Sequence, residues 1–79
     1  MSRHIRNHLG LLHGELRDAI DHLNAANAAF RMLRGSPVES IGNLAASCGI
    51  LVGDAERQTR EALEAVSDFL KEVNAHDRA

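Results

Sequence analysis

One short segment of the sequence separates two long helical patterns: Leu33-Arg34-Gly35-Ser36-Pro37-Val38-Glu39. Arg34 suits the negative end of a first helix, and Gly35 after it predicts a left-handed cap. Ser36 is a preferred N-cap residue, Pro37 is favoured in the first turn, and Glu39 completes a capping box. The segment therefore predicts that one helix ends at about residue 34 and another begins at about residue 37, with a turn at 35–36.

Apolar residues recur at steps of four and three on both sides of this turn, as in a heptad seam. In the first helix, about 3–34, they are Ile5, Leu9, Leu12, Leu16, Ala19, Leu23, Ala26, Phe30 and Leu33. In the second, about 37–75, the seam runs through Val38, Ile41, Ala45, Cys48, Val52, Ala55, Thr59, Ala62, Val66, Phe69 and Val73. The pattern predicts an all-α protein: a single domain over 1–79 that forms an antiparallel two-helix hairpin.

Gly53-Asp54 leaves two alternatives for the second helix. Glycine costs about 1 kcal/mol inside a helix, and Asp54 resembles the N-cap of a new one. The heptad phase nevertheless passes through this point without a slip. We expect one continuous helix, with a break at Gly53-Asp54 as the alternative.

A fold about Gly35-Ser36 predicts that facing positions sum to about 71, so that Leu23 lies opposite Cys48. The second helix would then extend past the first, and Phe69 and Val73 would lack cover within the chain. The stretch 40–53 is also apolar on more than one face, which is typical of a helix buried on several sides. We therefore expect a homodimer that forms an antiparallel four-helix bundle; a parallel dimer or a tetramer would also bury this surface. The expected interface residues are Leu44, Cys48, Ile50, Leu51, Val52, Phe69 and Val73.

Composition argues against several classes of function. The chain has 79 residues, a net charge of −2 and two aromatic residues, Phe30 and Phe69, so stacking platforms for bases are not expected. Cys48 is the only cysteine, which excludes an internal disulfide and favours a reducing, cytoplasmic setting. The longest uncharged stretch, 40–53, is shorter than the roughly 20 residues of a membrane span, so no membrane association is expected.

No residue pattern indicates catalysis. The carboxylates do not converge, and Cys48 is expected to pack in the core without a neighbouring base. His4 and His8 share a helix face, but two ligands are too few for a structural zinc site. We expect no enzyme activity, no cofactor and no metal.

These observations favour a non-enzymatic interaction module that binds itself and another protein. Leu11, Met32, Ile50 and Leu70 are the expected contacts for a second protein. The alternative is a four-helix bundle that binds nucleic acid through arginines of the first helix, with binding that weakens steeply as salt rises. Those arginines are Arg3, Arg6, Arg17, Arg31 and Arg34.

Overall fold

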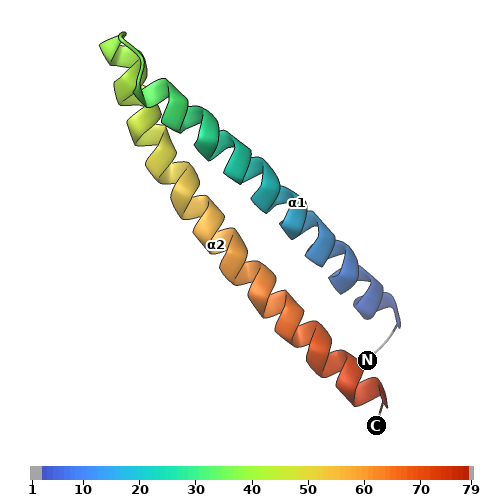
Figure 1. Cartoon of the computed structure of the whole chain (residues 1–79). Helices are drawn as coiled ribbons and strands as arrows, with labels where there is room; N and C mark the ends of the chain where they lie inside the picture. Colours follow the sequence, from blue (N-terminus) through green and yellow to red (C-terminus); the bar gives the residue numbers. More distant parts are fainter. Residues whose placement is uncertain (1–2, 79) are drawn as a thin grey trace.

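The computed structural model describes the backbone of residues 3–78 and the side chains of residues 3–75. Two long helices, α1 (Arg3–Arg34) and α2 (Glu39–Arg78), lie side by side and run in opposite directions (Figure 1). The hairpin is a rod with extents of 61 × 15 × 12 Å. The predicted all-α hairpin is therefore confirmed.

The connection between the helices is longer than the sequence predicts. α1 ends with two tight i→i−3 hydrogen bonds, in which the amides of Gly35 and Ser36 donate to the carbonyls of Met32 and Leu33 at 3.2 and 3.0 Å. Among the described residues no glycine has a positive φ, so the expected left-handed cap at Gly35 is wrong. The tightened last turn satisfies the end of α1 instead.

Ser36 acts as the N-terminal cap of α2, as predicted. Its Oγ accepts a hydrogen bond from the amide of Val38 at 3.1 Å. The carbonyl of Val38 accepts the first helical bonds, from Ile41 and Gly42, both at 3.1 Å. The helix therefore begins at Glu39, two residues later than the predicted Pro37.

α2 is continuous through Gly53-Asp54 and extends to Arg78, past the predicted end near residue 75. Asp54 stays within the helix, where its Oδ1 lies 3.8 Å from Nη2 of Arg57. The continuous helix is confirmed, and the alternative break is wrong.

The register of the hairpin differs from the predicted one. Phe30 lies against Gly49, and Nε2 of His13 lies 2.9 Å from Oγ of Ser67, so facing positions sum to about 79–80 rather than 71. The carbonyl of Arg34, at the end of α1, is level with Gly42, because the first turn of α2 extends past α1 (Figure 1). A four-residue connection and this overhanging turn account for the shift.

Two predictions fall with the register. The pairing of Leu23 with Cys48 is wrong. Val73, which was expected to lack cover within the chain, is only 5% exposed because the shift brings it opposite the first turns of α1. Among the described residues, the buried apolar ones are Ile20, Ala45 and Val73, which are 7%, 1% and 5% exposed.

Candidate interaction surface

Residues seven positions apart lie above one another along each helix, and we call such a set a column. Three columns on each helix are used below to describe how the hairpin packs. In the central column, half-buried or buried, are Leu9, Leu16, Leu23 and Phe30 of α1 and Ala45, Val52, Thr59, Val66 and Val73 of α2. The hairpin column, which also faces the other helix, holds His13, Ile20 and Asn27 of α1 and Gly42, Gly49, Glu56, Leu63 and Leu70 of α2. In the outer column are Ile5, Leu12, Ala19, Ala26 and Leu33 of α1 and Ile41, Cys48, Ala55, Ala62 and Phe69 of α2.

The heptad seam of the sequence consists of the central and outer columns, whereas the two helices meet through the central and hairpin columns. The outer column is therefore left half open to solvent. Ile5, Leu12 and Leu33 are 48%, 45% and 46% exposed, and Ile41 and Phe69 are 40% and 43% exposed. These exposed apolar residues recur along the length of the rod.

The outer columns of the two helices lie on the same side of the hairpin. On both helices each outer residue comes one position before a hairpin-column residue, as Leu12 precedes His13 and Cys48 precedes Gly49. One residue corresponds to a rotation of about 100°, and antiparallel right-handed helices that rotate by the same amount from their contact present both columns on one side. We call this the apolar side; Leu44 and Leu51, at 63% and 68% exposed, extend it on α2.

The structure separates the residues that the sequence predicts for the dimer interface. Leu44, Cys48, Leu51 and Phe69 belong to the apolar side. Val52 and Val73 lie in the central column, where α1 covers them at least in part. Ile50 is 62% exposed but shares a helix face with Gly53, on the opposite side of the rod.

The apolar side contains a shallow recess at the start of α1. It has a volume of about 290 Å³ and is lined by His4, Ile5, His8, Leu9 and Leu12. His8 donates a hydrogen bond from Nδ1 to the carbonyl of His4 at 2.9 Å, and the two rings lie 4.4 Å apart. The histidines thus border an apolar hollow.

Four of the five predicted nucleic-acid contacts, Arg3, Arg17, Arg31 and Arg34, are exposed, and Arg6 is half-buried. The structure places Arg31 and Arg34 in the lining of one recess. This polar recess has a volume of about 280 Å³ and lies on the side away from the apolar side.

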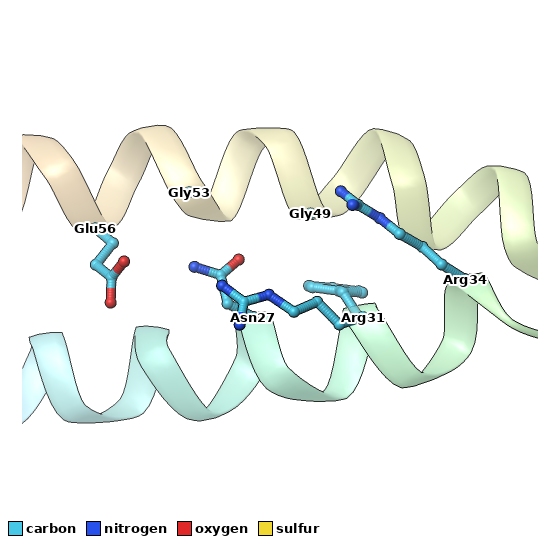
Figure 2. A pocket seen from close by; sticks show the side chains of 7 residues that line it. Asn27, Arg31, Arg34, Gly49, Gly53 and Glu56 are labelled. Atoms are coloured by element: carbon cyan, nitrogen blue, oxygen red, sulfur yellow. The ribbon is translucent and has the colours of Figure 1, made fainter.

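Residues of both helices form this polar recess. Asn27 and Arg31 of α1 and Glu56 of α2 extend into the space between the helices, and Arg34 crosses toward α2 beside Gly49 (Figure 2). Its full lining is Asn27, Phe30, Arg31, Arg34, Gly49, Gly53 and Glu56. The sequence alone does not predict this site. The available signal was two glycines four residues apart opposite Asn27 and Arg31, but only the true register places them together.

The described residues contain neither a candidate metal site nor a candidate membrane span. No three His, Cys, Asp or Glu side chains among them gather in a way that could hold a metal ion. Over the same part of the chain, neither helix has a segment both long and apolar enough to cross a membrane.

No protein-family model, curated protein or solved structure matches this chain.

Proposed function

We propose that the protein is a non-enzymatic interaction module that forms a homodimer, a four-helix bundle assembled through the apolar sides of two hairpins. The observation that carries this proposal is a rotation. The centre of the heptad seam lies between the central and outer columns, whereas the contact between α1 and α2 is centred between the central and hairpin columns. The outer and hairpin columns are one residue, about 100°, apart, so these two directions differ by about 50°.

A rotation of this size is what a four-helix bundle requires. In a square four-helix bundle, each helix has a neighbour along each adjoining edge of the square. The direction from a helix to the bundle axis then lies about 45° from the direction to that neighbour. The apolar seam of each helix should point at the axis rather than at its hairpin partner. In an isolated two-helix hairpin the seam would point directly at the other helix, because no further apolar surface would need cover.

The size of the apolar side supports a second copy as its occupant. Ile5 to Leu33 spans about 42 Å at 1.5 Å per residue, and two helices side by side are about 20 Å wide. Their product, about 840 Å², is close to the roughly 800 Å² that each partner buries in a standard stable interface. A second hairpin has the same length and width and covers the whole side.

The order of side chains also suits self-association. Large residues stand toward both ends of the outer columns, at Ile5 and Leu33 on α1 and at Ile41 and Phe69 on α2. Leu12 and Cys48 come next to these ends, and the middle of the columns consists of the small residues Ala19, Ala26, Ala55 and Ala62. In a two-fold dimer, whether parallel or antiparallel, large residues therefore meet large residues and alanines meet alanines. The alanines allow the helices to approach closely at the centre of the dimer.

The dimer would leave other apolar side chains for a second protein. Leu11, Met32 and Ile50 are 69%, 82% and 62% exposed and lie outside the apolar side. Leu70, predicted as a fourth contact, is half-buried in the hairpin column and does not belong to this set. We propose that the outer faces of the bundle carry this second interaction.

Sedimentation equilibrium tests the dimer directly. The chain has a mass of 8.6 kDa, and at micromolar concentration we expect twice this value. A mass of one chain throughout the micromolar range contradicts the proposal, and a mass of four chains replaces the dimer by a tetramer.

A further inference from the structure

We propose that the polar recess between Arg31 and Gly53 binds a phosphate group, either free phosphate or the phosphoryl group of a small molecule. The recess lies away from the apolar side, so a dimer formed through that side leaves it open. The inference therefore does not depend on the proposed dimer.

Two glycines create the space for this site. Gly49 is buried, and a methyl group added there would lie 3.0 Å from Nη2 of Arg34 and 3.6 Å from Cβ of Phe30. A methyl group at Gly53 would meet no atom within 4 Å. A side chain at Gly49 would push the Arg34 guanidinium away by at least a few tenths of an ångström, and a large side chain at Gly53 would occupy part of the recess. Each glycine costs about 1 kcal/mol of helix stability. The space that the two glycines leave for the recess gives a reason for this cost.

The recess carries a positive charge that the described residues do not neutralise. No ion pair or hydrogen bond joins the guanidinium of Arg31 or Arg34 to another described side chain. The one acid of the lining, Glu56, already has a partner on its own helix, because its Oε1 lies 3.5 Å from Nη2 of Arg60. Two unpaired guanidinium groups therefore face one carboxylate that is already paired.

Three side chains that can donate hydrogen bonds to an oxyanion, Asn27, Arg31 and Arg34, line the recess. Arg31 and Arg34 are three residues apart, and Asn27 is four residues before Arg31, so all three lie along one face of α1. Arg31 extends along α1 toward Asn27, whereas Arg34 crosses to α2, so the two guanidinium groups approach the recess from different directions (Figure 2). Guanidinium groups recognise phosphate through charge-assisted hydrogen bonds, and donors outside one plane favour its tetrahedral oxygens over a planar carboxylate.

The side-chain resonances of the arginines provide a direct test. The 15N-labelled full chain is titrated with inorganic phosphate, glycerol phosphate or acetate at constant ionic strength, and the Nε–Hε signals are followed by NMR. We expect those of Arg31 and Arg34 and the Asn27 side-chain amide to shift together and saturate with inorganic phosphate or glycerol phosphate. The tighter of these two probes identifies the source of the phosphate. Acetate should bind at least about tenfold more weakly, and Arg3 and Arg17 should not respond.

Two substitutions test the recess itself. Arg34→Gln should weaken phosphate binding by about ten- to a hundredfold, as expected for the loss of a hydrogen bond to a charged group. Gly53→Leu keeps both arginines but places a large side chain in the recess, and we expect it to abolish saturable phosphate binding. Gly10→Leu is the matched control, because a methyl group at Gly10 would also meet no atom within 4 Å and Gly10 does not line the recess.

Three results would overturn the inference. Equal, unsaturated shifts of the Nε–Hε signals of Arg3, Arg17, Arg31 and Arg34 would show only general screening by the anion. Unchanged phosphate binding in Gly53→Leu would exclude the recess as the site. A single-stranded RNA that shifts Arg3 and Arg17 together with Arg31 and Arg34, at concentrations far below those of phosphate, would identify a nucleic-acid surface instead.

Discussion

Leu51 offers the sharpest test of the apolar side as a dimer interface. It is 68% exposed in the single hairpin, so its side chain contributes little to the packing of α2 on α1. Leu11 is a matched control, because it is also a leucine in a helix and is 69% exposed, but it lies outside the apolar side, on the face of α1 that is turned away from α2. Leu51→Ala and Leu11→Ala remove the same atoms from the same degree of exposure.

The expected effect follows from the exposed fraction. Complete burial of a leucine side chain contributes about 1.5–3 kcal/mol. The partner would cover the 68% of Leu51 that the hairpin leaves open, which is about 1–2 kcal/mol per protomer and about 2–4 kcal/mol per dimer, since a two-fold interface contains the residue twice. We expect Leu51→Ala to raise the dimer Kd by about 30-fold or more and Leu11→Ala to leave it nearly unchanged.

Sedimentation equilibrium over a series of protein concentrations measures both Kd values, and circular dichroism confirms that both variants stay helical. Any gain in helix propensity from alanine is the same in the two variants, so it cancels in the comparison. Equal Kd values for the two variants would refute the assignment of the apolar side. If only Leu11→Ala weakened the dimer, the interface would lie on the face of α1 that is turned away from α2.

Three further predictions test separate parts of the structure. Gly14→Ala should raise the free energy of unfolding by about 1 kcal/mol, because a methyl group there meets no atom within 4 Å; no gain in urea denaturation would contradict this. Ser67→Ala removes the partner of His13 and should cost about 1 kcal/mol in the same assay, whereas Ser47→Ala, at an exposed position, should be nearly neutral. Cys48 lies on the apolar side, so its reaction with a thiol reagent should slow as protein concentration rises, and a rate independent of concentration would argue against its burial in a dimer.

The sequence was sufficient to predict both helices because their signals are local. Ser36 and Pro37 mark the start of α2, and the heptad phase across Gly53 is unbroken. The observed end of α1 at Arg34 agrees with the prediction, and α2 differs by two or three residues at each end. Periodicity and capping depend on neighbouring residues, which a single sequence contains in full.

The register could not be predicted in the same way, because it depends on the shape of the connection. Val38 belongs to the connection rather than to α2, and Gly35 does not take the left-handed conformation assumed for it. Without the register, Gly49 could not be placed against Phe30, nor Gly53 in the recess with Arg31. The candidate phosphate site therefore emerges only from the structure.

The composition of the hairpin column explains why folding and association should be coupled. Several of its positions are polar or lack a side chain, including His13, Asn27 and Gly49, so this column adds less apolar surface to the contact between α1 and α2 than a column of large apolar residues would. The large apolar residues of the outer column, which are Ile5, Leu12, Leu33, Ile41 and Phe69, are 40–48% exposed, and this exposed part would stabilise the fold only after a second hairpin covers it. Mass action then links stability to protein concentration. A substitution in the hairpin column acts within each chain, whereas one on the apolar side acts through the dimer, and only the second effect should diminish as the protein is diluted.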